Sequence, residues 1–116
     1  MSDTDCLFCK FVSGELNADI VYETDKVIAF RDINPQAPTH VLIVPRKHIA
    51  SINDLTDSDR EEIGNLYLAA KEVAKEAGFS EDGYRVVMNC NAAAGQTVFH
   101  VHLHLLGGRT FSWPPG

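Results

Sequence analysis

The segment HVHLHLL at residues 100–106 constrains the fold of this chain more than any other stretch. Histidines alternate with aliphatic residues, and successive side chains of a β-strand point to opposite faces of a sheet. We therefore predict a strand over residues 97–106. Its three histidines would share one face, and Val101, Leu103 and Leu105 would pack into the protein core from the other.

One amphipathic helix is predicted to cover that core. Apolar residues recur at helical spacing from Ile63 to Ala77. Thr56 and Asp59 form a capping pattern ahead of this segment, and Gly78 is suited to the position just after a helix end. The long helix should therefore lie between residues 56 and 78.

Shorter elements complete the predicted architecture. Strands are expected at residues 20–23, 26–31, 39–45 and 84–90, and a short helix at residues 5–13. Strands joined by hairpin-sized gaps around one long helix indicate an α+β fold. We expect a mostly antiparallel five-stranded sheet with one long helix and a short N-terminal helix, forming a single domain over residues 1–116.

Composition excludes several classes of partner. The chain has 116 residues with 10 Lys+Arg against 16 Asp+Glu, a formal net charge of −6, which disfavours nucleic acid as a partner. No apolar run approaches the roughly 20 residues of a membrane span, so no membrane partner is expected. Three cysteines, Cys6, Cys9 and Cys90, without an export signal indicate reduced thiols in the cytoplasm.

The three aligned histidines admit three interpretations. Buried structural histidines are disfavoured, because each unpaired donor or acceptor would cost about 1–3 kcal/mol. Two of the histidines could bind a metal ion. Alternatively, one imidazole attacks phosphorus as a nucleophile, since histidine titrates near neutral pH. The turn Gly95-Gln96-Thr97 directly upstream favours this last interpretation, because its backbone and polar groups can hold an anion.

The chain resembles the histidine triad (HIT) superfamily, because the segment HVHLHLL fits the signature of that superfamily. The stretches DINPQAPTHVLIVPRKHI (32–49), GQTVFHVHLHLLGGR (95–109) and WPPG (113–116) are similar to its Hint branch of nucleotide-binding proteins. The resemblance covers nearly the whole chain. It implies a homodimer that hydrolyses adenosine or guanosine 5′-phosphoramidates to a nucleoside monophosphate and an amine.

The resemblance also implies roles for four histidines. His102 matches the nucleophile, and His104 the residue that contacts the phosphate and assists the leaving group. His100 matches the residue whose backbone carbonyl holds the nucleophile. His40 matches a fourth histidine in the relay.

A nucleotide pocket is implied in the same way. Asp32 matches the carboxylate that accepts both ribose hydroxyls, and Thr97 stands where the family commonly has Ser. Trp113 matches a tail residue near the partner subunit's site. The full implied nucleotide-binding set is Asp32, Ile33, Asn89, Gly95, Gln96, Thr97, Phe8, Phe30, Leu42 and Trp113.

The CxxC pair of Cys6 and Cys9 is half of a possible structural zinc site. A pair of buried cysteines explains it equally well, and a redox pair is less favoured because no thioredoxin-like pattern surrounds it. His48 and His100 are the candidates for the two further ligands that a tetrahedral site needs. Superfamily members with this N-terminal pair resemble zinc binders of that type. No cofactor is expected to be required for catalysis itself.

Three rival functions stay open at this point. The chain could hydrolyse dinucleoside polyphosphates, although the LLGGR and WPPG segments argue against it. It could bind nucleotides as an interaction module without catalysis. It could also be a metal-dependent hydrolase that uses the HxH pair.

Overall fold

Two central strands organise the fold by alternating their buried side chains between the faces of one sheet. The structure is a computed structural model that describes residues 5–116. Strands β2 (Val27–Arg31) and β3 (Thr39–Pro45) are almost entirely buried. One face carries Val27, Ala29, Val41 and Ile43, and the other carries Ile28, Phe30, Leu42 and Val44. Each face therefore needs its own cover.

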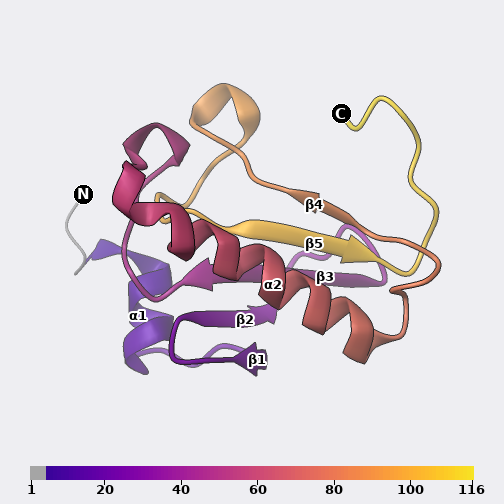
Figure 1. Cartoon of the computed structure of the whole chain (residues 1–116), viewed down its shortest axis with the longest axis horizontal. Coiled ribbons are helices and arrows are strands. Elements are labelled where there is room, and N and C mark those ends of the chain that lie inside the picture. Colours follow the sequence, from indigo (N-terminus) through magenta and orange to yellow (C-terminus); the bar gives the residue numbers. More distant parts are fainter. Residues whose placement is uncertain (1–4) are drawn as a thin grey trace.

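The sheet has five strands in the order β1-β2-β3-β5-β4, and all neighbouring pairs are antiparallel. The edge strands are β1 (Ile20–Glu23) and β4 (Arg85–Val87), and β5 (Leu103–Gly107) lies between β3 and β4. Figure 1 shows this arrangement with the long helix lying across the sheet. The predicted α+β class with a five-stranded antiparallel sheet, one long helix and one short helix is confirmed.

Helix α2 (Arg60–Ala77) covers one face of the sheet. The predicted capping box of Thr56 and Asp59 is present, but it caps a 3-10 turn at Asp57–Asp59 that leads into the helix. Gly78 ends α2 in the left-handed conformation at φ 88°, where other residues are strained. Further 3-10 turns lie at Ile52–Asp54 and Ala92–Ala94. No helix within residues 5–116 is both long and apolar enough to cross a bilayer.

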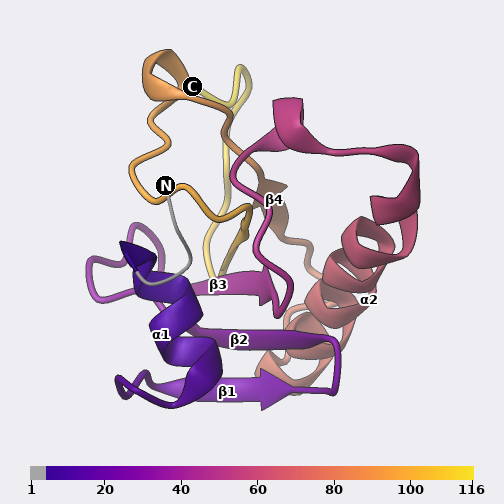
Figure 2. The ribbon, with the colours of Figure 1, turned by 90° about the vertical axis from the view of Figure 1, so that its left-hand side faces the viewer.

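Helix α1 (Leu7–Ser13) packs against the opposite face, as the view in Figure 2 makes clear. Cys6 is its N-cap residue and accepts a hydrogen bond from the backbone N–H of Cys9 through Sγ, at 3.3 Å. Phe8 is the buried residue of the helix and packs with Phe30 and Leu42 from the sheet. The face that carries the histidines is therefore partly covered by α1.

Two predicted strands are shorter in the structure than the sequence indicates. β5 begins at Leu103 rather than at residue 97, and β4 ends at Val87 rather than at residue 90. Ile43 pairs with Leu103, so the register would place Pro45 opposite Val101. Proline has no N–H to continue a ladder. The N–H of Val101 donates instead to the carbonyl of Ile49, at 2.7 Å.

Candidate active site

A cavity of about 590 Å³ lies between α1 and the sheet face that α1 covers. It gathers eight of the residues predicted from the sequence, of which four are apolar and four are polar or reactive. These are Phe8, Phe30, Leu42, Ile33, Thr97, Asp32, His102 and His104. The fold thus brings predicted residues from five separate segments into one cavity.

Aromatic rings form the wall of this cavity. The ring centroids of Phe8 and Phe30 are 5.3 Å apart in an edge-to-face arrangement, and those of Phe11 and Phe30 are 5.0 Å apart. Ile33 is fully exposed at 101% and lies at the cavity lining. Phe11 was missed by the sequence analysis, although its position one helical turn after Phe8 places both rings on the same side of α1.

His102 is held in one tautomer by the backbone. Its Nδ1 lies 2.7 Å from the carbonyl oxygen of His100. A carbonyl can only accept, so Nδ1 carries the proton and Nε2 keeps a free lone pair. Burial lowers the pKa of His102, outweighing the raising effects of that hydrogen bond and of Asp32. His102 is therefore a neutral imidazole with a lone pair available at the cavity.

His40 and His104 form a second fixed pair. The backbone N–H of Gln36 donates to Nδ1 of His40 at 3.0 Å, so His40 carries its proton on Nε2. That Nε2 lies 2.9 Å from Nδ1 of His104, which must accept, and the proton of His104 is then on its own Nε2. Gln36 was missed by the sequence analysis, because a backbone donor leaves no trace in side-chain identity.

Burial also keeps this pair uncharged. It lowers the pKa of His40, against a raising effect of Asp32. It lowers the pKa of His104 to about 4, assisted by charge repulsion from His102 and His40. Near neutral pH the pair is a chain of neutral hydrogen-bond donors that ends at Nε2 of His104.

Asp32 lines the cavity and lies next to this pair. Its Oδ1 accepts from the backbone N–H of Asn34 at 2.8 Å, and its Oδ2 lies 3.4 Å from Nε2 of His40. Each carboxylate oxygen can accept more than one hydrogen bond. The carboxylate can therefore still accept hydroxyl donors from a ligand.

The remaining predicted residues do not line this cavity. Asn89 lines a smaller hollow of about 300 Å³ that also contacts His40 and His104. Gly95 has φ 93° at the end of a 3-10 turn. Gln96 is buried, and its amide accepts from the N–H of Asn91 and donates to the carbonyls of Ala50 and Val98. Its side chain therefore braces the loop and does not face the cavity.

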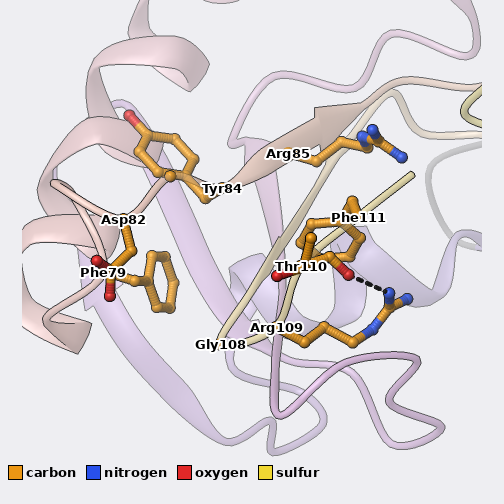
Figure 3. A pocket seen from close by; sticks show the side chains of 9 residues that line it. Phe79, Asp82, Tyr84, Arg85, Gly108, Arg109, Thr110 and Phe111 are labelled. Carbon is orange, nitrogen blue, oxygen red and sulfur yellow. Dashed lines mark hydrogen bonds between the residues drawn. The ribbon is translucent and has the colours of Figure 1, made fainter. Parts of the chain in front are cut away.

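Trp113 lies apart from both hollows, with 82% of its surface exposed. The tail before it is anchored by arginines: Arg85 and Arg109 stack on the ring of Phe111 at 5.2 and 4.2 Å, as Figure 3 shows. The hollow drawn there, about 600 Å³ in volume, is lined by none of the predicted site residues. The arginines anchor the tail, and the candidate chemistry belongs to the histidine cavity.

A separate cluster contains the four predicted metal ligands. Sγ of Cys6 and Sγ of Cys9 lie 3.3 and 3.5 Å from Nδ1 of His100, and Sγ of Cys9 lies 3.2 Å from Nδ1 of His48. All four ligand atoms lie within 4.8 Å of one another. Bond lengths of 2.0–2.3 Å to a tetrahedral zinc ion would separate ligand atoms by about 3.3–3.8 Å. Small shifts would therefore satisfy a Cys2His2 site.

The tautomer of His100 suits this role. Its Nε2 lies 2.7 Å from the carbonyl oxygen of Pro45 and must donate to it. Nδ1 is then left with a lone pair, and it is the atom that faces both cysteines. His100 is fully buried, at 0% exposure. The residues present fit a zinc ion without any change in the hydrogen bonding of His100.

Comparison with known proteins agrees with this geometry. A family model described as the HIT domain matches residues 13–111. The chain belongs to the HIT family. This HIT protein is 48% identical over 103 residues to the purine nucleoside phosphoramidase of Escherichia coli K12, covering 89% of this chain and 87% of that protein.

Solved structures of HIT proteins share the fold of this chain. A HIT family hydrolase from Legionella pneumophila has 56% identity and a TM-score of 0.94, covering 97% of this chain and all of the other. A zinc-bound histidine triad family protein from Mycobacterium smegmatis has 32% identity and a TM-score of 0.80, covering 93% and 78%. These relatives support a hydrolase, and one of them is a zinc-bound protein.

Proposed function

We propose that this HIT protein hydrolyses the P–N bond of purine nucleoside 5′-phosphoramidates, those of adenosine and guanosine. The products would be a nucleoside monophosphate and an amine. The observation that carries the proposal is the state of His102: its Nδ1 is committed to the carbonyl of His100, so Nε2 is an unprotonated nucleophile at the cavity.

The reaction would proceed in two displacements. Nε2 of His102 attacks the phosphorus atom, the P–N bond breaks, and the leaving amine takes a proton from the His40–His104 pair. Water then attacks the phosphorus of the nucleotidyl-His102 intermediate, returns a proton to that pair, and the P–His102 bond breaks to release the monophosphate. His104 presents a neutral Nε2–H, backed by the donor chain from Gln36 through His40, to the phosphoryl oxygens or the leaving nitrogen.

The cavity lining supports a nucleotide as the ligand. We assign the purine to the apolar wall of Phe8, Phe30, Leu42 and Ile33, and the two ribose hydroxyls to Asp32. Asn89 and Thr97 would contact the phosphate or the leaving nitrogen, and Gly95 and Gln96 would contribute through their backbone. Trp113 would act near the partner subunit's site of a homodimer.

The broader assignment follows the same reasoning. We propose that residues 1–116 form a single HIT domain that acts in the cytoplasm, with small nucleotides rather than nucleic acid or membrane as partners. A structural zinc ion would be held by Cys6, Cys9, His48 and His100. It would fix the fold around the histidines, and catalysis itself would need no cofactor.

The first test is hydrolysis of adenosine 5′-phosphoramidate by wild type and His102→Ala, each with and without a chelator. We expect turnover by His102→Ala to fall at least about 1000-fold, while AMP binding measured by calorimetry persists. A variant within tenfold of wild type, a difference of only about 1.4 kcal/mol in barrier, would show that His102 is not the nucleophile.

The same experiment separates the alternatives. A metal-dependent hydrolase would lose all turnover with the chelator at saturating substrate. A non-catalytic nucleotide-binding module would bind AMP and turn over neither substrate. A dinucleoside polyphosphate hydrolase would prefer diadenosine triphosphate to the phosphoramidate in a side-by-side assay.

A further inference from the structure

His100 is bound at three points, and each point belongs to a different part of the molecule. Its Nδ1 faces the thiols of Cys6 and Cys9 at the start of α1. Its Nε2 donates to the carbonyl of Pro45 at the end of β3. Its own carbonyl accepts from Nδ1 of His102. One buried residue thus joins the metal-ligand cluster directly to the proposed nucleophile.

The sheet itself does not fix His102. Its strand begins only at Leu103, so residues 100–102 lie outside the ladder of β3 and β5. The N–H of Val101 is held by the carbonyl of Ile49, the residue that follows the predicted ligand His48. The orientation of His102 therefore depends on segments that meet at the cysteine–histidine cluster.

The same cluster anchors the aromatic wall of the cavity. Cys6 and Cys9 flank Phe8 in α1, and the ring of Phe8 contacts His102 edge-to-face with centroids 5.0 Å apart. It contacts His100 at 6.0 Å and Phe30 at 5.3 Å in the same way. A change in how the thiols hold α1 would move the wall and the nucleophile together.

We infer that the Cys6, Cys9, His48 and His100 cluster positions the nucleotide site, so that the cluster's occupancy by a metal ion sets the affinity for nucleotide. Cys9 and His48 are then positioning residues that act on His102 through His100 and on the purine through Phe8. The inference rests on the proposed nucleotide pocket. A thermodynamic coupling between two sites is reciprocal, so bound nucleotide must tighten metal binding by the same factor.

The experiment measures both directions on the full chain. AMP affinity is determined by calorimetry for zinc-loaded and chelator-stripped wild type. Zinc affinity is determined by competition with a chromophoric chelator, with and without saturating AMP. We expect AMP to bind about tenfold more weakly to the stripped protein, or about 1.4 kcal/mol, and zinc to bind about tenfold more tightly with AMP present.

Variants and a spectroscopic signal sharpen the result. Cys9→Ser and His48→Asn should each weaken both zinc and AMP binding, whereas Cys90→Ser, a thiol outside the cluster, should change neither. Cobalt-loaded wild type needs no stripped protein: addition of AMP should shift its thiolate-to-cobalt absorption bands. Far-UV circular dichroism at 25 °C establishes that each protein compared is folded.

The outcomes are distinct. Equal AMP affinities for loaded and stripped protein, within twofold, with an unchanged cobalt spectrum would overturn the inference and leave a purely structural metal site. Absence of AMP binding by the zinc-loaded protein would instead contradict the proposed nucleotide function, and the coupling would fall with it.

Discussion

Two clusters of side chains that could hold a metal ion differ in how the backbone hydrogen-bonds to their histidines. In each, the ligand atoms lie within 4.8 Å of one another: Cys6, Cys9, His48 and His100 in the first, and Asp32, His40 and His104 in the second. In the first, Nε2–H of His100 donates to the carbonyl of Pro45, so the lone pair on Nδ1 faces the thiols. In the second, the N–H of Gln36 donates to Nδ1 of His40, so Nε2–H of His40 faces His104.

The difference shows that residue type alone does not decide between a metal site and a proton relay. A metal ion needs converging lone pairs, whereas a relay needs donors and acceptors in alternation. The backbone group that hydrogen-bonds to each imidazole determines which ring nitrogen carries the proton, and therefore which of the two roles the histidine can take. We therefore propose that the first cluster, which we call the thiol cluster, binds a metal ion, and that the second, which we call the relay cluster, handles protons.

The largest expected effect is on stability, through the thiol cluster. A ligand present at about 1000 times its dissociation constant stabilises the folded state by about 4 kcal/mol. We expect chelation to lower the free energy of unfolding by about that amount, measured by urea denaturation. Cys6→Ser should lose the same stabilisation and respond no further to the chelator. Wild-type stability that is indifferent to zinc would mean that the thiol cluster is not a metal site.

The relay cluster should instead make stability depend on pH. The folded-state pKa of His104 is about 4, against 6.5 for an unperturbed histidine. Between these values the unfolded chain binds more protons, so stability falls as pH drops from about 6.5 to about 4. We expect His104 to contribute up to about 3 kcal/mol of that loss, at 1.4 kcal/mol per pH unit.

A matched variant isolates this contribution. His104→Gln keeps a polar side chain but cannot titrate, so its stability should fall less over the same pH range. Urea denaturation of both proteins at pH 7 and pH 4 gives the difference, in which metal release and carboxylate titration cancel because both proteins share them. Parallel pH profiles would rule out a buried neutral His104.

The direction of the relay can be tested at His40. Asparagine there can imitate Nδ1 and keep the bond from the Gln36 N–H, but it loses the donor to His104. Glutamine can imitate the Nε2 end and keep that donor. We expect kcat to fall roughly 100-fold for His40→Asn and roughly tenfold for His40→Gln, within the usual range for assistance by a proton donor. The reverse order would invert the tautomer derived for His40.

Much of the fold was predictable because the pattern of apolar side chains reports burial. Short apolar segments at residues 26–31 and 39–45 predicted β2 and β3, and helical spacing up to Gly78 predicted α2. The alternation of histidines and aliphatic residues misled at residues 97–102. These residues were predicted to be paired, yet pairing of β5 with β3 begins only at Leu103. Alternation describes which way side chains point, and it carries no information about whether a neighbouring strand can supply hydrogen bonds.

The site was predictable only as a set of residue types. The sequence grouped His48 with the cysteines because those types bind zinc, and the structure brings His48 to Cys9 across 39 positions. The resemblance implied the contact between the His100 carbonyl and His102, which the structure has at 2.7 Å. The sequence could not predict the tautomers of His100 and His40, since they are set by the carbonyl of Pro45 and the N–H of Gln36. Backbone groups are the same in every residue, so no side-chain pattern reveals them.

The binding of zinc itself compares the two clusters most directly. Zinc at the relay cluster would have to displace the proton on Nε2 of His40, and the Gln36 N–H prevents the other tautomer. We therefore expect wild type to bind one equivalent of zinc, with any second equivalent at least about 100-fold weaker, a difference of about 2.7 kcal/mol.

The double variant Cys6→Ser/Cys9→Ser should then bind no zinc tightly, although Asp32, His40 and His104 are intact. Calorimetric titration of both proteins measures this, with Asp32→Asn as the control for the relay cluster. If wild type bound a second equivalent of zinc tightly and Asp32→Asn did not, the relay cluster would also be a metal site. The tautomer set by the Gln36 N–H would then not prevent metal binding, and the proposed difference between the two clusters would be wrong.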